Sequence, residues 1–124
     1  MRLVSKPLSV SIERPAALVY QFLSLPENFP RWSSDWIAET PEGPGTWSFS
    51  ERNAFGVLDF ALRRPGGRSI YVPLRVVANG KDCELVLTLF RRPDMSDQEF
   101  AAAAGRAKRD LLAAKGLLET QPVT

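Results

Sequence analysis

Residues 95–118 read MSDQEFAAAAGRAKRDLLAAKGLL, and this stretch decides the fold. Ser96 and Glu99 have the spacing of a capping box, in which each side chain accepts a hydrogen bond from the backbone N–H of the other. Met95 and Phe100 lie where a hydrophobic staple closes over such a cap. Beyond the cap, one helical face carries a continuous apolar stripe made of Phe100, Ala104, Ala107, Leu111, Ala114 and Leu118. The sequence therefore predicts an amphipathic helix of about 20 residues.

A β-hairpin is predicted upstream of this helix, with its turn at Asn79-Gly80. Both residues tolerate positive φ, as tight hairpin turns require. Placing Ala78 opposite Lys81 makes one face of the hairpin wholly apolar, through the pairs Val76–Cys83, Leu74–Leu85, Val72–Leu87 and Ile70–Leu89. A slip of one residue would place polar side chains opposite apolar ones, so the pattern favours this register.

The two strands of this hairpin are predicted over 68–78 and 81–91. Their other face pairs Arg75 with Glu84, a candidate ion pair across the strands. Pro73 interrupts the first strand. We expect a β-bulge there, because proline removes one hydrogen bond from the ladder.

Shorter elements are predicted before the hairpin. Aliphatic residues that alternate with serines indicate a strand over 8–12. A helix is predicted to begin at Pro15, since proline fits the first turn of a helix. A second, short helical turn is expected to end at Trp32. Three further strands are predicted over 35–40, 46–50 and 54–63.

The segment over residues 9–32 reads SVSIERPAALVYQFLSLPENFPRW. Followed by a strand-rich middle and a long closing helix, it resembles the START-like, polyketide cyclase/dehydrase superfamily (SRPBCC, helix-grip fold). The resemblance implies an α+β fold in which a curved antiparallel sheet of about six strands wraps the C-terminal helix. Two short helices would lie between the first and second strands. We expect a single START-like domain over residues 1–119 and a C-terminal tail over 120–124.

Composition is typical of one globular domain. The chain has 124 residues, of which 44% are hydrophobic, and a net charge of only +2. That charge is too small to indicate a nucleic-acid partner, and no apolar run is long enough to span a membrane. The N-terminus lacks the apolar stretch of a signal peptide, and the single cysteine permits no internal disulfide. The sequence therefore predicts a cytoplasmic protein.

The chain contains no histidine, which excludes whole classes of enzyme site. Ser-His-Asp and Cys-His nucleophiles, histidine proton shuttles and most transition-metal sites all need that residue. Four carboxylates are candidate acids or bases, and no two of them are expected to converge on the predicted interior: Asp35, Glu39, Asp59 and Glu84. We therefore predict no catalytic residue, no metal ligand and no cofactor.

The resemblance implies a cavity between the sheet and the C-terminal helix that holds a small hydrophobic molecule, such as a lipid, a polyketide or a quinone. The residues predicted to line it are Trp36, Trp47, Phe49, Leu58, Phe60, Val72, Leu74, Leu87, Phe100, Ala104, Ala107 and Leu111. The same residue types make an ordinary packed core, so only the volume between them separates the two interpretations. Trp32 is predicted to plug the end of the sheet and Trp36 to lie at the mouth of the cavity.

A cluster of basic residues also follows from the predicted register. Arg68 falls opposite Arg91, with three further arginines beside them, which gives an edge made of Arg63, Arg64, Arg68, Arg91 and Arg92. Like charges that face each other favour an anionic counterpart, so this edge could bind an anion or an acidic partner. Arginines beside an exposed turn are, more often, simply solvated and have no such role.

Three functions remain open. The first is a binder or carrier of a small hydrophobic ligand, held mostly by burial. The second is an interaction module that acts through its surface and has a filled core. The third is a cyclase- or dehydrase-like enzyme. A homodimer could form through an outward apolar patch made of Tyr71, Val77, Val86 and Phe90.

Overall fold

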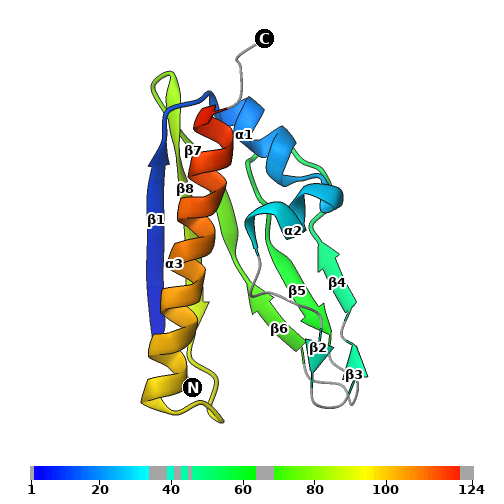
Figure 1. Ribbon diagram of the computed structural model, residues 1–124, viewed down its shortest axis with the longest axis vertical. Coiled ribbons are helices and arrows are strands. Elements are labelled where there is room, and N and C mark those ends of the chain that lie inside the picture. The colour runs from blue at the N-terminus through cyan, green and yellow to red at the C-terminus, as the bar shows by residue number, and fades with distance from the viewer. Residues whose placement is uncertain (1, 34–38, 41–42, 45, 64–68, 121–124) are drawn as a thin grey trace.

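The computed structural model describes residues 2–33, 39–40, 43–44, 46–63 and 69–120. The elements, in chain order, are β1 (Ser5–Ile12), α1 (Ala16–Leu23), the 3-10 turn η1 (Pro26–Asn28), α2 (Phe29–Trp32), β2 (Glu39–Thr40), β3 (Gly43–Pro44), β4 (Thr46–Phe49), β5 (Phe60–Arg63), β6 (Ser69–Val72), β7 (Leu74–Asn79), β8 (Asp82–Phe90) and α3 (Asp97–Thr120) (Figure 1).

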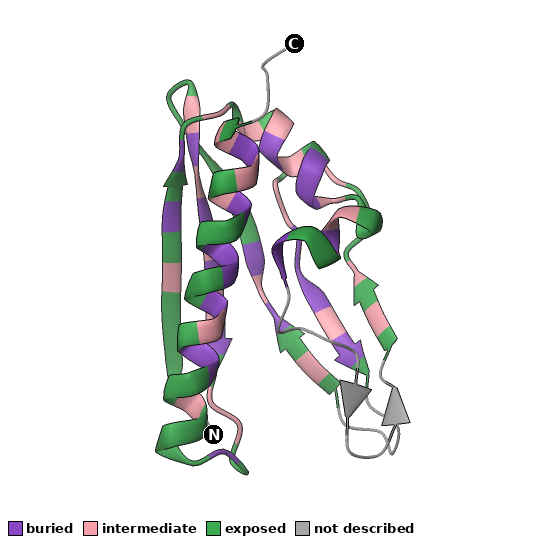
Figure 2. Ribbon diagram, in the orientation of Figure 1, coloured by how far each residue is buried: buried purple, intermediate pink, exposed green. Residues whose placement is uncertain are grey.

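The strands form two three-stranded antiparallel sheets, in the orders β1-β8-β7 and β4-β5-β6, together with the short pair β2–β3. The long helix α3 packs against β1, and α2 packs against α3 (Figure 1). The inner faces of both sheets share one hydrophobic core with α1, α2 and the buried stripe of α3 (Figure 2). This arrangement confirms the predicted α+β helix-grip fold, in which antiparallel strands hold a long C-terminal helix.

The predicted hairpin forms, but its register is wrong by two residues. Asn79 pairs with Asp82, so the turn residues are Gly80 and Lys81. Gly80 has φ +61°, and none of the described non-glycine residues has a positive φ. A turn with glycine in that state at its first central position is of type II′, so it needs no positive φ at the second. Because the shift is even, every side chain keeps the face that was predicted for it.

The pairs across the hairpin change with the register. Val76 lies opposite Leu85 and Leu74 opposite Leu87, and all four side chains are buried. The predicted ion pair between Arg75 and Glu84 is also wrong, because the residue opposite Arg75 is Val86.

The predicted bulge at Pro73 is instead a break between two strands. β6 ends at Val72 and pairs with β5, whereas β7 begins at Leu74 and pairs with β8. The predicted pairs Val72–Leu87 and Ile70–Leu89 are therefore wrong. Proline has no N–H to offer the ladder, but its carbonyl still accepts a hydrogen bond from Thr88 at 3.1 Å. The chain thus passes from one sheet to the other at the residue where the ladder is weakest.

The strand predicted over 54–63 is shorter than expected, since β5 begins at Phe60. The residues before it hydrogen-bond to β7 instead: Leu58 N donates to Leu74 O at 2.7 Å, and Val76 N donates to Gly56 O at 2.9 Å. This loop therefore joins the two sheets across the Pro73 break.

The capping box that was predicted for α3 is confirmed. Ser96 N donates to Glu99 Oε1 at 2.9 Å, and Glu99 N donates to Ser96 Oγ at 3.0 Å. The helix also covers the edge strand β1: the ammonium groups of Lys108 and Lys115 donate to the carbonyls of Ser9 and Ser11, at 3.1 and 2.6 Å. Carbonyls left open on an edge strand invite pairing with another chain, and these two lysines occupy two of them.

Candidate functional site

The predicted ligand-facing residues lie together on the inner side of the grip. Eight are buried in the core, namely Leu58, Phe60, Val72, Leu74, Leu87, Ala104, Ala107 and Leu111. Trp47, Phe49 and Phe100 pack against that core and are half-buried. Trp36 falls outside the described residues. The structure thus brings the described members of the set onto one face, while their role in ligand binding stays a prediction.

An aromatic cluster fills one end of this face, and its central residue was missed by the sequence analysis. Phe29, at the start of α2, has the rings of Trp32, Trp47, Phe49 and Phe60 around it, with ring centroids 5.2–5.7 Å away. The rings meet edge to face, which is the favoured geometry for aromatic pairs. Trp32 is buried, as the predicted plug requires. The cluster anchors the short helix α2 on β4 and β5.

Two polar side chains meet inside this apolar region, one that follows α2 and one from α3. Ser33, just after α2, donates from Oγ to Asp110 Oδ2 at 3.0 Å, and both residues are buried. The indole Nε1 of Trp32, the residue that precedes Ser33 in the sequence, is buried without a hydrogen-bond partner. Asp110 was missed as a site residue, although its spacing from Ala107 and Ala114 places it on the apolar stripe. An acidic residue within such a stripe is the signal that could have identified it.

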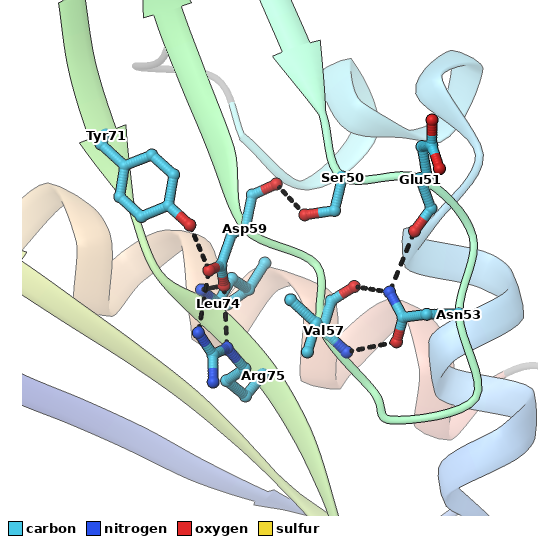
Figure 3. A network of polar contacts seen from close by, with 8 residues as sticks. All are labelled: Ser50, Glu51, Asn53, Val57, Asp59, Tyr71, Leu74 and Arg75. Atoms are coloured by element: carbon cyan, nitrogen blue, oxygen red, sulfur yellow. Dashed lines mark hydrogen bonds and ion pairs between the residues drawn. The ribbon is translucent and has the colours of Figure 1, made fainter.

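Asp59 lies on the outer face beside Tyr71 and Arg75 (Figure 3). It is buried there, with 6% of its surface exposed. Its Oδ1 accepts hydrogen bonds from Leu74 N and Arg75 Nε, each at 2.9 Å. Its Oδ2 accepts one from Arg75 Nη2 at 2.9 Å and one from the hydroxyl of Tyr71. The donors lie on both sides of Pro73, so the carboxylate holds the ends of β6 and β7 together.

These contacts explain the electrostatics of Asp59. The hydrogen bonds from Arg75 lower the pKa of Asp59 from 3.8 to about 2, and those from Tyr71 and Leu74 act in the same direction against the effect of burial. The bond to Asp59 also raises the pKa of Tyr71. A carboxylate with four donors around it is a structural clamp, and it is poorly suited to accept a proton from a substrate.

The other candidate reactive groups among the described residues are also held by structural contacts or buried. Glu84 accepts hydrogen bonds from Ser11 at 2.7 Å and Asn79 at 3.2 Å, and these bonds lower its pKa. Cys83 is fully buried, and burial raises the pKa of its thiol to about 11, so the thiol is protonated and inert at neutral pH. Glu39 lies in β2, and Asp35 falls outside the described residues.

The predicted arginine edge rested on a register that is wrong. β6 pairs with β5, and the end of β8 pairs with β1, so the strand pairing from which the edge was predicted does not form. Arg91 donates a hydrogen bond to Met95 O and forms an ion pair with Asp97. Arg92 forms an ion pair with Asp94, with 3.5 Å between Nε and Oδ1. Exposed Arg63 ends β5, whereas Arg64 and Arg68 fall outside the described residues. Binding of an anion or partner by the five arginines stays a prediction.

Solved structures of low sequence identity have this same arrangement of strands and helices. A START superfamily protein from Mycobacterium smegmatis has a TM-score of 0.66 at 16% identity, with 93% of this chain and 97% of that chain covered. The Aha1 dimer from Colwellia psychrerythraea has a TM-score of 0.71 at 13% identity, with 95% and 98% covered. The chain has the START-like, helix-grip fold. CalU16 from Micromonospora echinospora shares it, with a TM-score of 0.67 at 16% identity, and 96% and 76% covered.

The START-like fold places the inner-face residues between the sheet and α3. No protein-family model and no curated protein matches the sequence, so the likeness is one of structure. Within the described part of the chain, no helix is long and apolar enough to cross a membrane. Nor do three His, Cys, Asp or Glu side chains gather there as metal ligands would.

Proposed function

We propose that the chain binds a small hydrophobic molecule between its sheet and α3. One observation carries the proposal: three apolar side chains on the inner face of β4 and β6, those of Trp47, Phe49 and Ile70, are only half-buried. On the other sheet, the inner-face residues Val76 and Leu85 are buried. Apolar side chains that remain partly exposed on the inner side of the fold support a binding site for an apolar ligand.

Binding is also the step that the enzyme alternative requires. A cyclase-like reaction needs a ligand held on the inner face and a group that acts on it. Among the described residues, Asp110 is the buried carboxyl group that lies toward the interior, since Asp59 is held on the outer face. The proposal therefore concerns binding, which both alternatives share.

The test is native mass spectrometry of the protein purified from cells without denaturant, followed by thermal unfolding with palmitate, cholesterol and ubiquinone. We expect a retained or added ligand and a raised melting temperature. A ligand at a hundredfold its Kd stabilises the folded state by about 2.7 kcal/mol. Protein that is consistently empty, with no shift for any of the three compounds, would contradict the proposal.

A pair of variants locates the site. We expect Ile70→Arg to abolish the thermal shift, because a guanidinium on the half-buried inner face makes the site polar. Val77→Arg places the same charge at an exposed position of β7, and we expect it to bind as the wild type does. Unchanged binding by Ile70→Arg would show that the ligand lies elsewhere.

The homodimer stays a prediction. Three members of the proposed patch are exposed, Tyr71, Val77 and Phe90, while Val86 is half-buried. The hydroxyl of Tyr71 is already bonded to Asp59, so its ring is held in place at the sheet surface. The cytoplasmic location, the absence of a nucleic-acid partner and the division into residues 1–119 and 120–124 stay predictions as well.

A further inference from the structure

An open groove runs along one flank of α3. Its volume is about 430 Å³, and the described residues that line it are Ala102, Gly105, Arg106 and Arg109. The last three follow the first by three, four and seven positions, so the helix places all four in one row on its surface. Sites for small organic molecules have volumes of roughly 300–1,000 Å³. The groove is therefore large enough to hold such a molecule.

The groove lies on the flank of α3 that is turned away from β1. Lys108 and Lys115, on the other flank, donate hydrogen bonds to backbone carbonyls of β1. Arg106 lies one helical turn before Asp110, which accepts a hydrogen bond from Ser33 just after α2. Figure 1 shows β1 on one side of α3, with α2 and the strands β4 to β6 on the other. Arg106 thus lies on the side of the helix that carries the contact with α2.

Arg106 is half-buried, but its charge has no partner in the described part of the chain. No described residue there accepts a hydrogen bond from Arg106 or forms an ion pair with it. The described lining residues include no acidic side chain. A guanidinium group carries five N–H donors in a planar fork, and it binds oxyanions more strongly than neutral acceptors. The groove is therefore a positively charged site in which donors remain open.

Gly105 leaves space beside the two arginines. Its φ is not positive, and an added Cβ would meet no atom within 4 Å. Neither the backbone conformation nor close packing therefore requires glycine at this position, although glycine is less favourable than alanine within a helix. The missing side chain leaves room for the body of a bound molecule next to the guanidinium groups.

We propose that this groove binds a small organic anion, whose carboxylate or phosphate group accepts hydrogen bonds from Arg106 and Arg109. The fork of a guanidinium group matches the oxygens of either anion. The apolar body of the molecule lies over Ala102 and Gly105, beside the methylene groups of the arginines. No described residue of this groove belongs to the inner-face set, so the inference does not depend on the proposed function.

The experiment compares three naphthalene probes by titration of the 15N-labelled full chain. 2-Naphthoate carries a carboxylate, 2-naphthyl phosphate carries a phosphate, and 2-acetylnaphthalene has nearly the shape of the first without its charge. We expect one or both anions to bind about 10-fold more tightly than the ketone, the lower end of the range for charged hydrogen bonds, because Arg106 is only half-buried. The anion that binds more tightly identifies the head group. The backbone amide signals of residues 102–109 should shift during the titration.

Two variants and a control locate the site. Arg106→Gln removes the unpartnered charge, and we expect about 10-fold weaker binding of the anions and no change for the ketone. The control Lys81→Gln removes one charge from the exposed turn between β7 and β8, and it should bind as the wild type does. Gly105→Leu keeps every charge but fills the groove. Because leucine suits a helix better than glycine, this variant should melt no lower than the wild type and bind neither anion.

Three results would overturn the inference. Equal binding of the anions and the ketone would exclude an anionic head group. Wild-type binding of the anions by Arg106→Gln or Gly105→Leu would show that the site is not this groove. If neither anion binds at millimolar concentration, the groove is not a site for organic anions, while the proposed function, tested with palmitate, cholesterol and ubiquinone, is unaffected.

Discussion

Replacing Asp59 with asparagine is expected to lower the free energy of unfolding by about 2–4 kcal/mol. The substitution removes the charge that Arg75 pairs with and turns one oxygen into an NH2 group that faces other donors. The buried N–H of Leu74 donates to Asp59 Oδ1. In the asparagine variant it would either lose this acceptor or compete with Arg75 for the one side-chain oxygen that remains. Urea denaturation followed by circular dichroism measures the change.

The matched control is Glu84→Gln. Glu84 also accepts hydrogen bonds from two side chains, but it is only half-buried on the outer face, so we expect a change within about 0.5 kcal/mol. Equal effects of the two substitutions would contradict the clamp that Asp59 is argued to form across Pro73.

The same carboxylate gives a pH dependence whose direction follows from its pKa. The folded-state pKa of Asp59 is about 2 against 3.8 in the absence of its partners, so the unfolded chain takes up the proton first as the pH falls. The difference corresponds to about 2 kcal/mol, which is present above pH 4 or so and is lost between about pH 4 and pH 2. Asp59→Asn should lack this part of the acid dependence in parallel urea titrations.

Gly56→Ala is expected to destabilise the fold by about 3 kcal/mol or more. Gly56 has φ +75°, a backbone state that costs alanine free energy, and a Cβ there would lie 2.2 Å from the carbonyl oxygen of Val76. The methyl group would push the loop before β5 away from β7, and it would strain the hydrogen bond that Val76 N donates to Gly56 O. The midpoint of urea denaturation should therefore fall sharply.

Gly105→Ala provides a control of opposite sign. Gly105 lies on the exposed side of α3, and an added Cβ would meet no atom within 4 Å. Alanine is favoured over glycine within a helix by about 0.5–1 kcal/mol, so this variant should be slightly more stable than the wild type. A stability of Gly56→Ala equal to that of the wild type would show that the loop can move away from β7 at little cost.

Local signals in the sequence were enough to predict α3, because the Ser96–Glu99 cap and the apolar stripe act within a few residues of each other. They also predicted which residues of the hairpin point toward the core, since that depends only on the alternation of apolar and polar residues. The register could not be obtained in this way. A shift of two residues preserves the alternation, and the choice between Asn79-Gly80 and Gly80-Lys81 depends on which turn type forms.

Other features depend on contacts between distant residues. The break at Pro73 is stabilised by Asp59, and nothing near Pro73 in the sequence distinguishes a break from a bulge. The meeting of Ser33 with Asp110 joins positions 77 residues apart, across the junction of α2 and α3. That the indole N–H of Trp32 is buried without a partner can also be seen only once the packing of the core is known. Asp110 differs from these, because its place on the helical stripe was visible in the sequence.

The pairing of β1 with β8 constrains the order in which the chain can fold. The contact between Ser11 and Glu84 spans 73 residues, and that between Glu13 and Glu119 spans 106. Strand β1 must therefore wait for β8 and α3, which follow much later in the sequence, and such long loop closures slow folding. A fragment that ends at residue 79 lacks β8, so β1 and β7 have no partner in it, and it should show less β-structure by circular dichroism than the full chain.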